Sequence, residues 1–120
     1  VDGCGVAVDV YHQNIEEKHV GAAIRSAAGR IAHVQVCAND RGAPGDDHLD
    51  WPDIAAALAE AGYTGPLCIE SFTARNASIA TAASIWRPLA PTQDALAVDG
   101  LAFLGALLAG RRAAGGSGGS

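Results

Sequence analysis

The sequence predicts an α/β protein built on a parallel sheet. Short apolar stretches rich in β-branched residues alternate with alanine-rich stretches of helical periodicity, in the order strand, helix, strand, helix, strand, helix, helix. The strands are apolar over most of their length, which is typical of parallel strands covered on both faces. Because helical crossovers join them, we expect right-handed βαβ units that form either a segment of a barrel or a small open sheet.

The first predicted strand covers residues 5–12, GVAVDVYH, and ends in polar side chains. Asn14 is a candidate N-cap for one long helix, whose first turn would carry Glu16 and Glu17 near the positive end of the helix dipole. Gly29 ends this helix, because a glycine at that point favours termination.

The second predicted strand, residues 31–37, leads into a polar loop over residues 38–50. Asp50 is predicted to cap the next helix, and Pro52 lies in its first turn, where the missing N–H costs nothing. Gly62 marks the end of that helix.

The third predicted strand covers residues 67–72. An alanine-rich helix is expected after it, beginning at Asn76 or Ser78 and reaching about Arg87, where two prolines interrupt the pattern.

The chain is predicted to hold one folded segment, residues 1–112, and a flexible Gly/Ser-rich tail, residues 113–120. The last helix of the folded segment covers residues 92–112 and carries a broad leucine stripe. At 120 residues the chain is short for a closed α/β barrel, which usually needs about 250. It contains no methionine, so the natural start is expected to lie upstream.

Composition limits the function classes. The net charge is −5 and basic residues are scattered, which argues against a nucleic-acid partner. No secretory signal and no uninterrupted apolar run of membrane-spanning length are visible, so we expect no membrane partner. Three cysteines without metal-type spacing indicate reduced thiols in a cytoplasmic protein.

Polar residues stand near the carboxyl ends of all three predicted strands, where parallel α/β proteins bind ligands. Asp9, Gln35 and Glu70 are expected to lie at one level and to converge there. Two carboxylates and an amide oxygen are hard ligands, so we predict a site for Mg²⁺, Mn²⁺ or Co²⁺. Taken singly, each residue also fits a structural role as a helix cap, an outward-facing amide or an ion-pair partner.

Three blocks carry a family resemblance: DVYHQNIEE (9–17), HVQVCANDRGAPGDDHLDW (33–51) and GYTGPLCIESF (62–72). They resemble the last three strands of the xylose isomerase-like TIM-barrel superfamily, in the branch of ketose 3-epimerases and hydroxypyruvate isomerases. The resemblance covers about residues 5–108. It implies a partial TIM (β/α)8 barrel, made of about the last three βα units with a C-terminal helix.

The resemblance also implies roles for single residues. Asp9, Gln35 and Glu70 would hold the divalent metal, and Glu70 would also move a proton through a cis-enediolate of a ketose. His12 and Arg41 would contact substrate oxygens. Ketose 3-epimerases typically carry His where Gln35 stands, whereas hydroxypyruvate isomerases carry Gln in a similar context. The family's first metal-binding Glu, on the preceding strand, has no counterpart in this sequence.

The expected function is therefore part of a divalent-metal-dependent sugar isomerase/epimerase, with the chain alone inactive. Two alternatives stay open: a hydroxypyruvate isomerase-like enzyme acting on a hydroxy-keto acid, and a non-catalytic fragment or scaffold with a residual metal site. We expect an oligomer or a complementing fragment as partner, because three strands leave sheet edges and barrel-interior surface uncovered.

Overall fold

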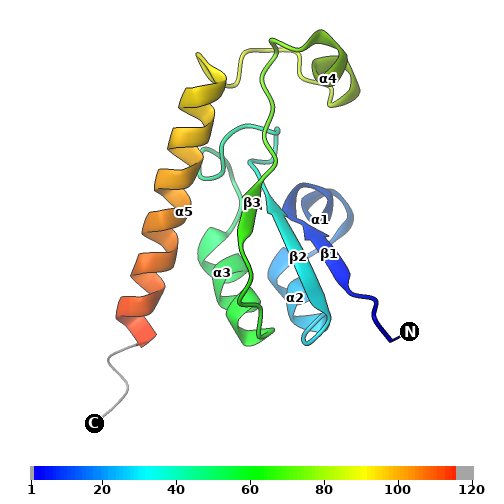
Figure 1. The fold of residues 1–120 in the computed structure, drawn as a ribbon, viewed down its shortest axis with the longest axis vertical. Coiled ribbons are helices and arrows are strands. Elements are labelled where there is room, and N and C mark those ends of the chain that lie inside the picture. The colour runs from blue at the N-terminus through cyan, green and yellow to red at the C-terminus, as the bar shows by residue number, and fades with distance from the viewer. Residues whose placement is uncertain (1, 116–120) are drawn as a thin grey trace.

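The computed structural model describes residues 2–115, with side chains through residue 110. Its strands form one parallel sheet whose order, β1-β2-β3, follows the chain (Figure 1). The strand bounds are β1 Val6–Asp9, β2 Ile31–Val36 and β3 Leu67–Ile69. The predicted α/β class is confirmed, and the three parallel strands fit a segment of a larger barrel.

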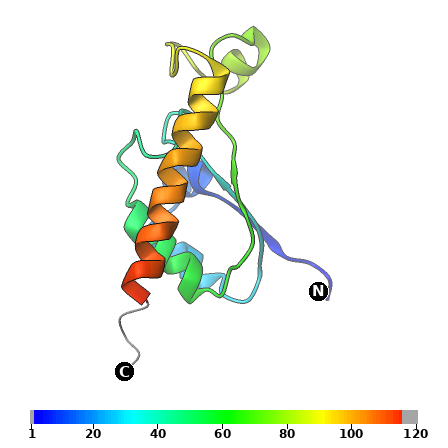
Figure 2. The same cartoon turned by 60° about the vertical axis from the view of Figure 1, so that its left-hand side comes forward.

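Helices follow each strand, and most of them lie on one side of the sheet (Figure 2). In chain order their bounds are α1 Val10–Glu16, α2 Val20–Ser26, α3 Trp51–Glu60, α4 Ala77–Ala82 and α5 Gln93–Gly115. Figure 2 shows α2, α3 and α5 on the same side of the sheet, whereas α4 stands apart, beyond the carboxyl ends of the strands. The helical crossovers expected between parallel strands are therefore present.

The core lies between the sheet and the helices on that side. Val8, Val34 and Val36 are at most 3% exposed. Ile24 on α2 and Ile54 on α3 meet them from the helical layer. The other buried members of this core are Val10, Leu49, Trp51, Ala57, Leu58, Ala61 and Leu104. Because side chains alternate along a strand, the intervening residues point to the opposite face of the sheet.

The first connection differs from the expectation of a longer strand and a single helix from Asn14. Instead β1 ends at Asp9, and two short helices, α1 and α2, follow it. The cause is the Asp9 side chain, which accepts a hydrogen bond from the Tyr11 N–H at 2.9 Å and so caps α1. Glu17 is extended, with φ −100° and ψ 144°, and separates α1 from α2.

α3 and α4 begin at the predicted caps. The Asp50 side chain accepts a backbone N–H bond at the start of α3, and the Asn76 side chain does the same for α4. α4 ends at Ala82, well before Arg87, and the prediction there is wrong. Ser84 has a left-handed φ of 56°, a conformation that cannot continue a right-handed helix.

α5 extends beyond its predicted end at residue 112 and reaches Gly115. Residues 113–115 therefore belong to a helix, although the sequence placed them in a flexible tail. The rest of that predicted tail, residues 116–120, lies outside the described residues.

α5 is also long and apolar enough to cross a membrane by length and composition, although no such segment was expected. The window Gln93–Gly110 has a mean hydropathy of 1.3, and 17% of it is buried. A core helix of a folded domain passes the same test, and α5 has a core-facing side, where Leu96 and Leu104 are each 5% exposed. The expected absence of a membrane partner stays a prediction.

Candidate active site at the carboxyl ends of the strands

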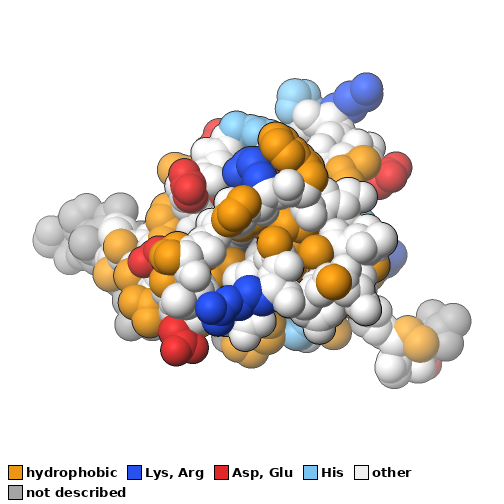
Figure 3. All heavy atoms as spheres, turned by 90° about the horizontal axis from the view of Figure 1, so that it is seen from above, with side chains coloured by type: hydrophobic (Ala, Val, Ile, Leu, Met, Phe, Trp, Pro, Cys, Tyr) orange, Lys and Arg blue, Asp and Glu red, His pale blue; other side chains and the backbone are white. Residues whose placement is uncertain are grey.

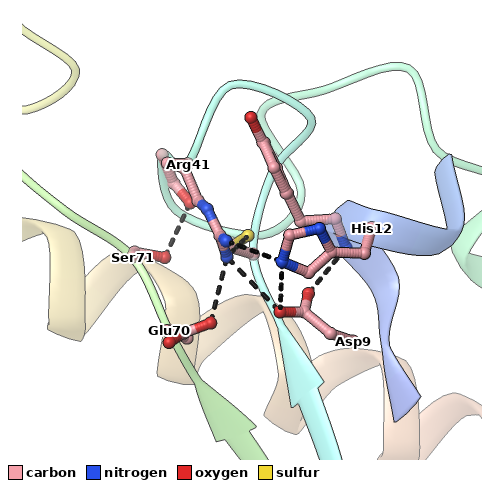
Figure 4. Close-up of polar contacts among 8 residues, drawn as sticks. Asp9, His12, Arg41, Glu70 and Ser71 are labelled. Carbon is pink, nitrogen blue, oxygen red and sulfur yellow. Dashed lines mark hydrogen bonds and ion pairs between the residues drawn. The ribbon is translucent and has the colours of Figure 1, made fainter. Parts of the chain in front are cut away.

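Arg41 lies at the centre of a polar cluster, which Figure 4 shows at the carboxyl ends of the strands. Its Nη1 lies 3.0 Å from Glu70 Oε2 and 3.6 Å from Asp9 Oδ2. Its Nη2 lies 3.4 Å from His12 Nε2. Asp9 ends β1, Arg41 comes from the loop after β2, and Glu70 follows β3 directly. Each strand of the sheet therefore contributes a charged residue to the cluster.

The loop that carries Arg41 is closed by hydrogen bonds to itself and to the segment after β3. The Arg41 N–H donates to the Ala38 carbonyl at 3.0 Å, and the Arg41 carbonyl accepts from the Phe72 N–H at 2.9 Å. The Ser71 hydroxyl donates to the Gly42 carbonyl at 2.7 Å. Arg41 has a φ of 74°, which is uncommon outside glycine, and strained backbone of this kind tends to cluster at functional sites. The backbone thus holds the guanidinium in the cluster.

The Arg41 guanidinium is largely removed from water. Its side chain is 10% exposed, and its Cζ lies 3.8 Å from the centroid of the Tyr11 ring and 5.5 Å from that of Phe72. Burial acts to lower the pKa of Arg41, but its contacts with a thiol and two carboxylates outweigh burial and raise that pKa above its ordinary value. The Arg41 side chain therefore stays positively charged.

One carboxylate oxygen of Asp9 caps α1, and the other lies within the cluster. Oδ1 accepts from the Tyr11 N–H, whereas Oδ2 lies 3.6 Å from both Arg41 Nη1 and His12 Nε2. His12 Nε2 can accept a hydrogen bond from Arg41 only when it carries no proton, and it can donate to Asp9 only when it carries one. The His12 side chain is 63% exposed, so a ligand can reach this imidazole.

The predicted metal ligands do not lie at one level of the sheet. Asp9 pairs with Gln35, but Gln35 pairs with Cys68, which stands two residues before Glu70. Glu70 is therefore displaced by about 6–7 Å along the strand direction. The expectation of a single level is wrong because of the pairing register: β3 pairs with β2 so that Cys68, and not Glu70, stands beside Gln35. Among the described residues, the Gln35 amide makes no polar contact with the cluster.

The predicted ligands Asp9, Gln35 and Glu70 fit a divalent cation only in part. Asp9 and Glu70 direct carboxylate oxygens, the hard ligands that Mg²⁺ and Mn²⁺ prefer, toward one cationic atom, Arg41 Nη1. Within the described part of the chain, no three His, Cys, Asp or Glu side chains are grouped to hold a metal ion. The two carboxylates thus fit the ion, and the third ligand, Gln35, stays a prediction.

Cys37, directly after β2, is a thiol that the sequence did not assign to the site. It is fully buried, and its Sγ lies 3.7 Å from Arg41 Nη1. Burial raises the pKa of Cys37 from 9.0 to about 11, although the hydrogen bond from Arg41 acts to lower it. The thiol therefore stays protonated at neutral pH and is a poor nucleophile.

We expect iodoacetamide at pH 8 to label Cys4 in the folded protein and to leave Cys37 unlabelled. Cys4 is exposed, whereas Cys37 is both inaccessible and protonated. Peptide mass spectrometry after a short reaction measures both sites, and the same reaction in denaturant should label all three cysteines. Equal labelling rates for Cys4 and Cys37 in the folded protein would contradict the burial of this thiol.

Sequence reasoning also missed the aromatic rings around Arg41. Tyr11 lies between two residues that were assigned, Asp9 and His12, and Phe72 stands two residues after Glu70. In the predicted strand 67–72, the alternation of side chains was a usable signal, because it places Phe72 on the same side as Glu70. Tyr11 could not be placed from the pattern, since it lies on α1 and the pattern predicted a strand there.

The surface near this end of the molecule is mixed in character. Figure 3, seen from above the carboxyl ends of the strands, shows positive, negative and hydrophobic side chains interspersed. The face shown there carries no broad basic area of the kind that nucleic-acid binding proteins present.

A charged cluster built at the carboxyl ends of parallel strands is typical of the active sites of α/β-barrel enzymes. Residues 1–106 match the family model described as xylose isomerase-like TIM barrel. The chain therefore belongs to the xylose isomerase-like TIM-barrel family, and the resemblance found in the sequence is confirmed.

Relatives within this family carry epimerase names. The chain is 43% identical over 100 residues to a Synechocystis sp. protein named "Probable ketose 3-epimerase", with 83% of this chain and 35% of the relative covered. It is 38% identical over 106 residues to L-ribulose 3-epimerase of Mesorhizobium japonicum, with 87% and 36% covered. A solved structure of L-ribulose 3-epimerase superposes with a TM-score of 0.87 and 36% identity, covering 99% of this chain and 41% of that one.

The chain thus spans little more than a third of the length of these relatives. Its assignment to the last three βα units stays a prediction, as do the metal, the substrate and the assembly partner.

Proposed function

We propose that this chain supplies part of the active site of a sugar epimerase of the ketose 3-epimerase type. The observation that supports this best is the cluster of Asp9, Arg41 and Glu70, which joins all three strand ends. The catalytic unit in this proposal is an intact barrel, because the chain spans about a third of its relatives. The chain alone is expected to be inactive.

Glu70 is the proposed proton carrier. Its carboxylate would take the proton from the carbon beside the ketose carbonyl, and the electron pair of that C–H bond would remain on an enediolate. Arg41 would bind a substrate oxygen, and its fixed positive charge would stabilise the enediolate. His12 would hold the carbonyl or an adjacent hydroxyl. A second group, on the rest of the barrel, would return a proton to the opposite face.

Asp9, Gln35 and Glu70 are the residues that would hold Mn²⁺, Mg²⁺ or Co²⁺. When bound, such an ion polarises a ketose carbonyl and makes the adjacent C–H more acidic. The neutral amide of Gln35, compared with the imidazole of typical ketose 3-epimerases, would favour the harder ions of this set.

The test is an assay of the intact barrel that contains this chain, with Mn²⁺ and L-ribulose or D-psicose in D₂O. We expect the C3 epimer to form with deuterium at C3, because one group removes the proton and another returns one from solvent. Chromatography measures the epimer, and NMR measures the isotope. Failure to form the epimer, or an epimer that fully retains its hydrogen, would contradict the proposal.

Hydroxypyruvate is the second substrate for this assay, because Gln35 stands where hydroxypyruvate isomerases carry the same residue. If hydroxypyruvate alone is converted, by proton transfer between neighbouring carbons, the isomerase alternative replaces the epimerase. If neither substrate reacts, the alternative of a scaffold with a residual site is favoured over both enzymes.

A further inference from the structure

Asp40, directly before Arg41 in the chain, closes a turn around it. Its Oδ1 accepts a hydrogen bond from the Gly42 N–H at 3.0 Å, so residues 40–42 form an Asx turn with Arg41 at the centre. Arg41 has its left-handed φ of 74° inside this turn. A Cβ at position 42 would lie 2.9 Å from Asp40 Oδ1, so a larger residue there would displace the carboxylate. The backbone conformation of Arg41 therefore depends on the Asp40 side chain.

The other carboxylate oxygen of Asp40 binds an arginine from a distant segment. Arg87 lies on the connection between α4 and α5, and its Nη2 is 2.7 Å from Asp40 Oδ2. Both side chains are partly exposed, so water weakens this ion pair without removing it. Ser71 and Phe72 hold the same loop by their hydrogen bonds to Gly42 and Arg41. The turn is thus fixed both from the end of β3 and from the α4–α5 connection.

A rotation of the backbone at Arg41 is magnified at the end of its long side chain. The guanidinium Nη1 lies 3.0 Å from Glu70 Oε2, and a shift of the turn would break this contact. Cys37 would register the same shift, because its fully buried Sγ lies 3.7 Å from Nη1. Movement of Arg41 would uncover one side of this thiol.

We propose that Asp40 and Arg87 are positioning residues of the candidate active site. Asp40 holds the backbone of Arg41 in its left-handed conformation, and Arg87 holds Asp40. The α4–α5 connection thereby sets how well the Arg41 guanidinium is aligned with a substrate oxygen. The catalytic consequence rests on the role of Arg41 in the proposed function, whereas the placement of Arg41 does not.

The first test uses Cys37 as a reporter of Arg41, in the intact barrel that contains this chain. We expect Asp40→Ala, which removes the turn and the ion pair, to raise the rate of iodoacetamide labelling of Cys37 by roughly tenfold, through local opening. Asp40→Asn keeps an oxygen for the Gly42 N–H and loses only the ion pair, so the rate should rise about two- to fivefold. Arg87→Gln breaks the same ion pair and should give the same rise.

Two comparisons make the labelling specific. The double variant Asp40→Asn/Arg87→Gln should label Cys37 no faster than either single variant, because both changes remove one contact. Asp46→Ala is the matched control, since Asp46 is an exposed aspartate of the same loop. Its labelling rate should equal that of the wild type. Arg87 is itself partly exposed, so Arg87→Gln keeps the test available if Asp40→Ala does not fold.

The second test separates positioning from general support of the fold, by epimerase assays of the folded variants. Asp40→Ala should lower kcat/KM roughly tenfold, by the same loss of the turn and the pair, and Asp40→Asn should restore most of it. In an Arg41→Gln background, Asp40→Ala should have no further effect, because no guanidinium remains to be placed.

Unchanged labelling of Cys37 in folded Asp40→Ala or Arg87→Gln would overturn the inference and leave the proposed function standing. Additive losses of kcat/KM in the Arg41→Gln background would also overturn it, since Asp40 would then act by another route. If the wild-type barrel forms no epimer, the proposed function fails and the catalytic part of the inference fails with it. The labelling rates would still decide whether Asp40 and Arg87 place Arg41.

Discussion

Replacement of Glu70 by glutamine is expected to lower kcat/KM of the intact barrel by roughly 10²–10⁴-fold, the contribution of a positioned acid–base group. Glutamine keeps the size of the side chain and can still accept a hydrogen bond from Arg41 Nη1, 3.0 Å away in the wild type. It cannot take up a proton, and it is a weaker metal ligand than a carboxylate. The loss should therefore appear in kcat at saturating Mn²⁺.

Glu60→Gln is the matched control for this variant. Glu60 is also a glutamate paired with an arginine, Arg25, but it lies on α3 and outside the cluster. It should leave kcat/KM unchanged, and both variants should melt close to the wild type. A Glu70→Gln enzyme with wild-type kcat would remove Glu70 from its proposed role.

Replacement of Trp51 by alanine is expected to destabilise the fold by about 3–5 kcal/mol, the usual cost of truncating a large buried aromatic residue. Trp51 begins α3, is 4% exposed, and packs edge-on against Phe103 of α5 with ring centroids 5.5 Å apart. Its indole Nε1 donates to Asp47, at 2.9 Å from Oδ1. Urea unfolding followed by circular dichroism measures the change.

Two variants separate the sources of this stability. Trp51→Phe keeps most of the packing and removes the bond to Asp47, so about 1–2 kcal/mol should be lost. Trp86→Ala truncates an indole that is 85% exposed and should change stability by no more than about 0.5 kcal/mol. If Trp51→Ala cost no more than Trp86→Ala, the core described here would be wrong.

The sequence predicted the parts of the fold that depend on local chemistry. Asp50 and Asn76 are caps because a side-chain oxygen can satisfy the first free N–H groups of a helix, and this needs no distant partner. The break between α1 and α2 was not predictable in the same way. Val10 and Tyr11 have strand propensity, and one hydrogen bond from Tyr11 to Asp9 overrides it.

The candidate site, like the fold, was predictable from the sequence only in part. The position of polar residues at strand ends indicated that Asp9 and Glu70 would approach each other, and both contact Arg41. The central place of Arg41 was not foreseen, because it depends on a left-handed φ of 74° and on a loop bonded to Phe72. The spacing of residues along the sequence also does not determine which residues of β2 and β3 pair. The offset between Gln35 and Glu70 could therefore not be predicted.

The sheet order β1-β2-β3 has a consequence for how the molecule is built. Each strand pairs with its predecessor along the chain, so no pairing has to pass over another strand. The entropic cost of closing the connection between two strands grows only slowly with its length. The segment can grow one βα unit at a time, in the order in which a ribosome delivers them. Such a design also tolerates recombination, because an exchange of whole units between related barrels leaves every remaining strand beside its former neighbour.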